Sequence, residues 1–271
     1  IYHKRLRPNT TVFDEQRYFT AGYDSDPLEL FVIGGVKVGV SICEEIWSPF
    51  GPLAEQAAAG AEVNININGS PFRVEKDLVR EQIVSTRAAD SHCAVVYVNQ
   101  VGGQDELVFD GGSFAVDHKG SLLARSPQFV EDIMIVDVPV PPVYRKRLLD
   151  PRGRVTNALL PTVEVSSAPR RAAAPTEPLL APITEPLSTD KELYDALVLG
   201  TRDYCQKNGF SDVVIGLSGG IDSTIVACVA ADALGPEHVH GVSMPSRYSS
   251  DHSKSDAAKL AENLGIDYRT L

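Results

Sequence analysis

Apolar and polar positions in the first half of the chain follow two periods. Val63, Ile65 and Ile67 alternate with two asparagines, and such alternation is typical of a β-strand. Segments 52–60 and 74–91 are predicted helices, and the Gly34–Gly35 pair and the run 117–120 predict hairpin turns. The predicted strands span residues 29–33, 36–42, 62–67, 94–99, 113–116 and 122–124. Hairpins mixed with helices indicate a layered α/β or α+β domain over residues 1–138.

From residue 188 onwards strands and helices alternate strictly. The run from Thr189 to Glu192 matches a capping box and predicts the start of a helix that ends at Gly209. The predicted strands are 212–217 and 239–244, and the predicted helices that follow them are 222–234 and 253–264. This β-α-β-α order predicts a doubly wound parallel sheet in a second domain, 188–271.

The segment between the two domains, 139–187, has a different composition. It holds more than half of the chain's 18 prolines. We therefore predict a semi-extended linker over these residues. Its basic run, 145–147, is interpreted as a solvent-exposed face.

Composition and charge limit the classes of protein. The chain of 271 residues is 43% apolar and 23% charged, which excludes wholesale disorder, and no apolar run approaches the ~20 residues that span a bilayer. The net charge of −11 argues against general binding of nucleic acid or of an anionic membrane. Four scattered cysteines without a CxxC pair argue against a zinc site and indicate a reducing compartment, so we expect a cytoplasmic protein. Because the first residue is not Met and both ends fall in patterned sequence, we expect an internal segment of a longer protein.

A glycine-rich turn follows the predicted strand 212–217. Gly219 and Gly220 allow the backbone to approach a phosphate closely, and the helix that follows adds the partial positive charge of its N-terminus. Ser218 and Ser223 add hydroxyl donors, and Asp222 is placed to hold Mg²⁺ against the phosphates. The spacing matches neither the Walker loop nor G-x-G-x-x-G, and a plain capped turn is the alternative.

This turn, Ser-Gly-Gly-Ile-Asp-Ser, resembles the pyrophosphate loop of the ATP pyrophosphatase superfamily, and residues 241–250 resemble the next strand and loop of NAD synthetases. The resemblance implies that ATP and Mg²⁺ are used, with Asp222 as the metal ligand. It places Met244 near the adenine and Arg247 near the nucleotide phosphates. The ATP-binding residues that it implies are Gly216, Ser218, Gly219, Gly220, Asp222, Ser223, Met244 and Arg247.

Cys43 ends an apolar strand and is the candidate nucleophile. A thiol at a sharp strand-to-helix turn is exposed to a substrate, and the helix N-terminus is expected to lower its pKa. The alternative is a buried structural cysteine, which is how we interpret Cys93, Cys205 and Cys228.

The segments around Cys43 and Lys4 resemble the nitrilase, or carbon–nitrogen hydrolase, superfamily, in the form of the glutaminase domain of glutamine-dependent NAD synthetases. The resemblance implies that Cys43 attacks the amide carbon and Lys4 stabilises the oxyanion, while a general-base glutamate lies upstream of residue 1. It also implies that Glu44 and Ser70 bind glutamine and that Glu15 orients the lysine.

Two positions depart from the family pattern. Thr10 stands where the family usually has Tyr, and Arg7 where it usually has an apolar residue. Both departures concern contacts to glutamine.

The fold implied is an incomplete nitrilase-like α-β-β-α sandwich followed by an incomplete doubly wound domain of the ATP pyrophosphatase type. The reaction implied is hydrolysis of glutamine through a Cys43 thioester and use of the ammonia to amidate ATP-adenylated deamido-NAD, in a homo-oligomer. Two alternatives remain. One is another glutamine-dependent amidotransferase with the same ATP loop. The other, for the isolated chain, is a nucleotide-binding fragment without catalysis, and we expect these 271 residues alone to lack glutaminase activity.

Overall fold

The chain divides into two compact units, and each is described by itself. The first comprises Ile1–Gln100 and Gly111–Pro186, and the second Val101–Asp110 and Leu187–Leu271. The computed structural model describes residues 1–9, 12–22, 26–150, 159–167, 179, 181–245 and 251–271.

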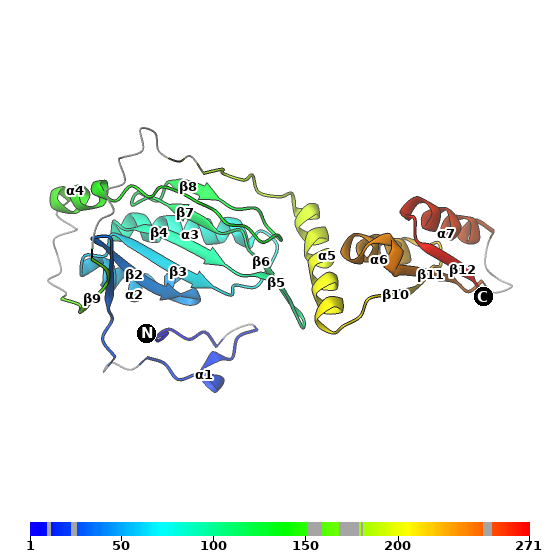
Figure 1. Cartoon of the computed structure of the whole chain (residues 1–271), viewed down its shortest axis with the longest axis horizontal. Coiled ribbons are helices and arrows are strands. Elements are labelled where there is room, and N and C mark those ends of the chain that lie inside the picture. Colours follow the sequence, from blue (N-terminus) through cyan, green and yellow to red (C-terminus); the bar gives the residue numbers. More distant parts are fainter. Residues whose placement is uncertain (10–11, 23–25, 151–158, 168–178, 180, 246–250) are drawn as a thin grey trace. The chain divides into compact units, whose positions relative to one another are not determined.

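A seven-stranded mixed sheet forms the first unit (Figure 1). Its strand order is β8-β7-β4-β3-β2-β1-β9. The three central strands β2, β3 and β4 are parallel, whereas the β1–β2 and β7–β8 pairs are antiparallel, as the two predicted hairpins require. The strands are β1 (Leu30–Ile33), β2 (Val36–Ile42), β3 (Val63–Asn68), β4 (Ala94–Asn99), β7 (Phe114–Val116), β8 (Leu122–Arg125) and β9 (Thr162–Ser166).

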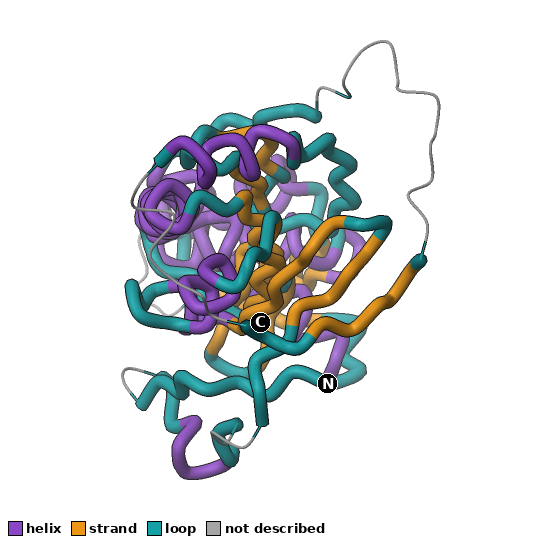
Figure 2. Tube along the Cα trace, turned by 90° about the vertical axis from the view of Figure 1, so that its left-hand side faces the viewer, coloured by secondary structure: helices purple, strands orange, loops and turns teal. Residues whose placement is uncertain are grey.

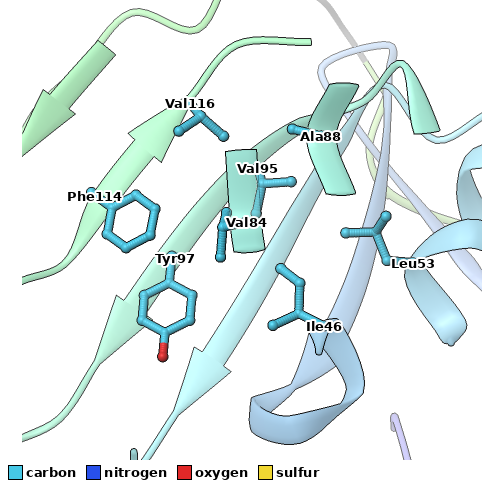
Figure 3. Close-up of a cluster of buried hydrophobic side chains, with 8 residues drawn as sticks. All are labelled: Ile46, Leu53, Val84, Ala88, Val95, Tyr97, Phe114 and Val116. Carbon is cyan, nitrogen blue, oxygen red and sulfur yellow. The ribbon is translucent and has the colours of Figure 1, made fainter. Parts of the chain in front are cut away.

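Helices α2 and α3 contact each other and the sheet. Between them and the strands lies a core cluster in which the rings of Tyr97 and Phe114 stack with centroids 4.9 Å apart (Figure 3). Ile46 belongs to this cluster and is fully buried, so the short turn that carries it is anchored in the core. The helices of this unit are α1 (Glu15–Tyr18), the 3₁₀ turn η1 (Cys43–Ile46), α2 (Pro52–Ala58), α3 (Lys76–Ser91) and α4 (Pro141–Leu149).

Strand β3 buries its asparagines rather than its aliphatic residues. Asn64 and Asn66 are fully buried, whereas Ile67 is half exposed. The hydroxyl of Ser41 donates to Asn64 at 2.8 Å and accepts from Asn66 at 2.9 Å. The alternating pattern therefore predicted the strand correctly but did not show which face is buried, since hydrogen bonds satisfy the buried amides.

The predicted linker contains ordered structure where it is described. Helix α4 and strand β9 lie within 139–187, and β9 pairs in parallel with β1. The basic run is a solvated face only in part: Arg145 is exposed as predicted, whereas Arg147 is partly buried and donates to the carbonyls of Ala61 and His92. The domain boundaries at residues 138 and 188 stay a prediction.

A three-stranded parallel sheet in the order β10-β11-β12 forms the centre of the second unit; strands are orange in Figure 2. Helix α6 packs on α5 and contacts β10 and β11. A two-stranded hairpin, β5–β6, contacts α5 and belongs to this unit. The elements are β5 (Val101–Gln104), β6 (Leu107–Asp110), α5 (Thr189–Lys207), β10 (Val213–Gly216), α6 (Ile221–Leu234), η3 (Pro236–His238), β11 (Val239–Ser243), α7 (Asp251–Leu264) and β12 (Asp267–Thr270).

The predicted start of α5 is off by one residue. Ser188, not Thr189, is the N-cap, and its hydroxyl accepts the backbone N–H of Lys191. Two adjacent hydroxyl residues offered two registers for a cap, and the capping-box pattern selected the wrong one. Gly209, with φ +77°, follows the helix end as predicted.

Among the described residues, no helix combines the length and the apolar character needed to cross a membrane.

Candidate functional site

Cys43 lies at a sharp backbone turn directly after β2. It is the first residue of η1 and has φ +51°, a left-handed conformation that costs a non-glycine residue about 1 kcal/mol. Ile46, three residues on, holds the turn in the core. The structure therefore confirms the predicted strand-to-helix turn.

Lys4 is held by Glu15, the first residue of α1. Its Nζ lies 2.7 Å from both carboxylate oxygens, and both side chains are largely shielded from water. The backbone N–H of Glu15 also donates to the carbonyl of Pro8 at 3.2 Å. The predicted partnership between these two side chains is thus present in the geometry.

Burial and Lys4 act in opposite directions on the Cys43 thiol. Burial is the larger effect and raises its pKa, while the positive charge of Lys4 lowers it. The expected effect of the turn is present, because a backbone hydrogen bond from Glu44 lowers the thiol pKa, but burial outweighs it. Only one 3₁₀ turn follows Cys43, too short for a strong dipole, and the residue is 6% exposed.

Glu44 borders a surface cavity of about 500 Å³. Burial raises the pKa of its carboxyl, and the positive charges of Lys76 and Lys4 lower it. The guanidinium-bearing residues Arg5 and Arg7 line the same cavity. The Arg5 and Arg7 guanidinium groups donate to backbone carbonyls, of Asp26 and Phe19 respectively. Cys43, Lys4 and Ser70 are not among the residues that line this cavity.

Ser70 follows the carboxyl end of β3, the strand next to the one that ends at Cys43. Its backbone N–H donates to Asn99 at 2.9 Å, and its hydroxyl accepts from Nε of Arg80 at 3.3 Å. Parallel strands end at one edge of a sheet, so Ser70 and Cys43 lie at the same edge.

Glu45, two residues after Cys43, is a buried carboxylate whose part in the site was not predicted from the sequence. It is fully buried and accepts hydrogen bonds from residues on both sides of Lys4. Glu44 and Glu45 are adjacent and identical in type, so only their position relative to the turn distinguishes them.

The glycine-rich loop is held by its own serines. The hydroxyls of Ser218 and Ser223 lie 3.1 Å apart, and the N–H of Gly220 donates to Ser218 at 3.2 Å. Gly219 has φ +79°, which a side chain would disfavour. Asp222 is exposed in the first turn of α6, where a carboxylate can share a Mg²⁺ ion with phosphate oxygens.

The neighbouring strand end brings Met244 to this loop. A Cβ on Gly216 would lie 3.6 Å from the methyl carbon of Met244. Met244 itself is mostly exposed. Strand β10 alternates between half-buried and exposed residues, although three of its four residues are aliphatic. Arg247 and Thr10 lie outside the described residues.

Within the described part of the chain, no three His, Cys, Asp or Glu side chains gather to form a metal site. A Mg²⁺ ion at Asp222 would therefore depend on the nucleotide for its other ligands, as Mg²⁺ bound through substrate phosphates commonly does.

Both units match known families. Residues 1–147 match the carbon–nitrogen hydrolase family model, and residues 193–271 match the NAD synthase family model. The chain therefore belongs to the carbon–nitrogen hydrolase family. Its second part matches the NAD synthase family, and each of the two units has a mixed α/β fold.

Over its whole length the chain is similar to proteins described as glutamine-dependent NAD(+) synthetases. It is 47% identical to that of Aquifex aeolicus (strain VF5), with 100% of this chain and 47% of the relative covered. It is 45% identical to that of Thermotoga maritima, with 98% and 46% covered. The chain thus spans about half the length of these curated relatives.

Solved structures agree with this similarity. The structure of glutamine-dependent NAD+ synthetase from Acinetobacter baumannii in complex with ADP is 36% identical, with a TM-score of 0.76 over 99% of this chain and 44% of that chain. The synthetase from Cytophaga hutchinsonii, at 19% identity and a TM-score of 0.69 over 99% of this chain and 46% of that chain, supports the fold alone.

Proposed function

We propose that the first unit hydrolyses glutamine to glutamate and ammonia. The Cys43 sulfur forms a bond to the amide carbon, and the thiol proton leaves through the proton-shuttling glutamate that the family resemblance implies. The ammonium group of Lys4 stabilises the negative oxygen of the tetrahedral intermediate. The C–N bond then breaks, ammonia departs with the proton, and water hydrolyses the thioester to glutamate and free thiol.

The observation that carries this proposal is that the Lys4–Glu15 pair lies close enough to the Cys43 turn for the charge of Lys4 to act on the thiol, and that Glu45 of this turn is hydrogen-bonded to the residue after Lys4. Glu15 binds the ammonium group through both oxygens and so fixes its orientation. Glu44, which directly follows Cys43 in the chain, is proposed from the resemblance to bind the ammonium group of glutamine. Ser70 supplies a further hydroxyl at the same sheet edge.

The second unit, in this proposal, binds ATP and adenylates the carboxylate of deamido-NAD, with release of pyrophosphate. Ammonia then displaces AMP and NAD forms. The loop 218–223 offers backbone N–H groups and hydroxyls to the phosphates, with Gly216 and Met244 beside them. Arg247 is proposed for the phosphates from the resemblance alone. Mg²⁺, held through Asp222, would neutralise phosphate charge when bound.

Substitution of Cys43 tests the division of labour. In the complete protein, we expect Cys43→Ala to abolish NAD synthesis with glutamine and to leave synthesis with ammonium salt unchanged. Cys93→Ala is the matched control, since Cys93 is a buried thiol of the same unit away from the turn. Glutamine-dependent synthesis by the Cys43 variant would contradict the proposal.

Substitution of Asp222 tests the other site. We expect Asp222→Asn to lower synthesis with both nitrogen sources and to raise the Mg²⁺ concentration needed for half-maximal rate, while glutamine hydrolysis without ATP persists. Asp232→Asn, on the same helix and bonded to Tyr194 at 2.6 Å, is the control. Equal rates for wild type and Asp222→Asn at every Mg²⁺ concentration would remove Asp222 from the site.

We also propose, from the resemblance, a cytoplasmic homo-oligomer. Light scattering of the purified complete protein measures the oligomeric state, and a monomer at micromolar concentration would contradict that part of the proposal.

A further inference from the structure

Glu45 connects the two chain segments that carry the Cys43–Lys4 site. Its side chain is fully buried and is two residues beyond Cys43 within the same short turn η1. Because a buried carboxylate is costly unless it is hydrogen-bonded, the donors that surround it indicate what it does.

One of its oxygens binds the segment around Lys4. Oε1 accepts the backbone N–H of Arg5 at 2.6 Å and that of Leu6 at 3.3 Å. These are the two residues that follow Lys4 in the chain, so this oxygen fixes the backbone from which the lysine side chain projects.

The other oxygen joins both segments. Oε2 accepts the hydroxyl of Tyr2 at 2.7 Å and the backbone N–H of Ile42 at 2.7 Å. Tyr2 precedes Lys4 by two residues, and Ile42 directly precedes Cys43. Burial and the bond to Glu45 both raise the pKa of Tyr2, which agrees with its role as a donor.

All four donors are neutral, and together they bracket Lys4 on both sides while holding the residue before the nucleophile. The turn is itself anchored by Ile46 in the core. Glu45 therefore transfers the rigidity of the core to a segment that contains no sheet strand, since residues 1–9 have no regular secondary structure.

We propose that Glu45 is a positioning residue of the Cys43–Lys4 site, which sets the place of the Lys4 ammonium group relative to the Cys43 thiol without touching the substrate. This inference rests on the proposed glutaminase function. A misplacement of about 1 Å in a catalytic group can lower a rate about 100-fold, so the effect belongs in kcat rather than in glutamine binding.

The experiment compares Glu45→Gln with Glu55→Gln in the complete protein. Glutamine keeps the size of the side chain but has only one acceptor oxygen, so one pair of donors loses its partner. Glu55 is an exposed glutamate of α2 and controls for the loss of a charge. We expect Glu45→Gln to lower the glutaminase kcat about 10- to 100-fold with KM for glutamine within about threefold, and ammonia-dependent synthesis to be unchanged.

A second readout does not need glutamine. Lys4 lowers the pKa of the Cys43 thiol, so displacement of Lys4 must raise this pKa. The rate at which iodoacetamide alkylates Cys43 should then rise only at higher pH than in wild type. Mass spectrometry of the peptide that contains Cys43 measures this rate as a pH profile. Glu45→Asp, which keeps both oxygens on a shorter side chain, is expected to restore part of both kcat and the profile.

Tyr2→Phe covers the case in which Glu45→Gln does not fold. It removes one hydroxyl donor and leaves the carboxylate and its three backbone donors in place, so we expect a smaller loss of kcat in the same direction. If kcat and the alkylation profile of a folded Glu45→Gln protein match wild type while only its thermal stability falls, Glu45 is structural and the inference is overturned. If wild type hydrolyses no glutamine, the proposed function fails, and the alkylation profile still decides the role of Glu45.

Discussion

At the scale of single residues, the reactivity of Cys43 depends on how burial balances against one lysine. Burial disfavours the thiolate, and Lys4 favours it. We expect Lys4→Met to raise the thiol pKa further and to move Cys43 alkylation by iodoacetamide to higher pH. Lys76→Met is the matched control. Lys76 lowers the pKa of the neighbouring Glu44 carboxyl, whereas Lys4 is the lysine that lowers the pKa of the Cys43 thiol. Identical profiles for wild type and Lys4→Met would show that the two groups do not interact.

The sequence predicted the residues of this site, including Glu15 as the partner of Lys4, but it did not predict Glu45. Cys43 follows an apolar strand, and Lys4 lies in a recognisable segment, so both were predictable. The role proposed for Glu45 rests on contacts with Tyr2 and Arg5, about forty residues away in the chain. Such long-range hydrogen bonds have no local signal in a single sequence.

At the scale of elements, mutation can show whether Ser188 or Thr189 is the N-cap of α5. Ser188→Ala removes the hydroxyl that accepts the Lys191 N–H, and we expect it to lower the free energy of unfolding by about 1 kcal/mol in urea titrations. Thr189→Ala, one residue along, is expected to change it by clearly less. A larger loss from Thr189→Ala would favour the capping box.

A second element-scale prediction concerns the ends of three parallel strands. His240 of β11 lies 3.2 Å from Asp267 of β12 and 3.2 Å from Asp212, which precedes β10. Hydrogen bonds to Asp267 and Asp212 raise the pKa of His240 above its ordinary 6.5. Bonds from Ser211 and His240 lower the pKa of Asp212, and a bond from His240 lowers that of Asp267, both from an ordinary 3.8.

The directions of these three pKa shifts define the pH range in which the cluster stabilises the fold. The raised pKa of His240 gives stability that is full below pH 6.5 and is lost as the pH rises through the folded value. The lowered aspartate pKa values give stability that is full above pH 3.8 and is lost as the pH falls. Urea midpoints of wild type and His240→Gln should therefore differ most between about pH 4 and 6.5. A difference that does not vary with pH would contradict the cluster.

Most strands and helices were predictable because their apolar periods are clear, and α2, α3, β4 and α6 lie within about two residues of their predicted bounds. Strand β9 was missed because its alternating run lies among prolines, and composition outweighed a five-residue pattern. It joins the sheet through pairing with β1, a partner about 130 residues earlier. Pairing at that distance is a tertiary effect that local pattern does not encode.

At the scale of the whole molecule, each unit has its own core, which predicts separate responses to a core truncation. Val95 lies in the core cluster of the first unit and Val239 in that of the second, and both are fully buried. We expect the same substitution, Val→Ala, to lower the free energy of unfolding of the unit that carries it by about 2 kcal/mol. Hydrogen exchange followed by mass spectrometry should show faster exchange in β4 and α3 for Val95→Ala, and in β10 and β11 for Val239→Ala.

The hairpin β5–β6 makes this experiment discriminating, because it lies in the chain between two segments of the first unit yet belongs to the second. The N–H of Gly103 donates to Asp203 of α5 at 2.7 Å, and a Cβ on Gly103 would lie 3.1 Å from the Cα of Gly200. Since these contacts tie the hairpin to α5, its amides should keep their protection in Val95→Ala and lose part of it in Val239→Ala. If the hairpin amides lose protection in Val95→Ala and not in Val239→Ala, the hairpin unfolds together with the sheet of the first unit. The units that unfold cooperatively would then differ from the two compact units of the structure.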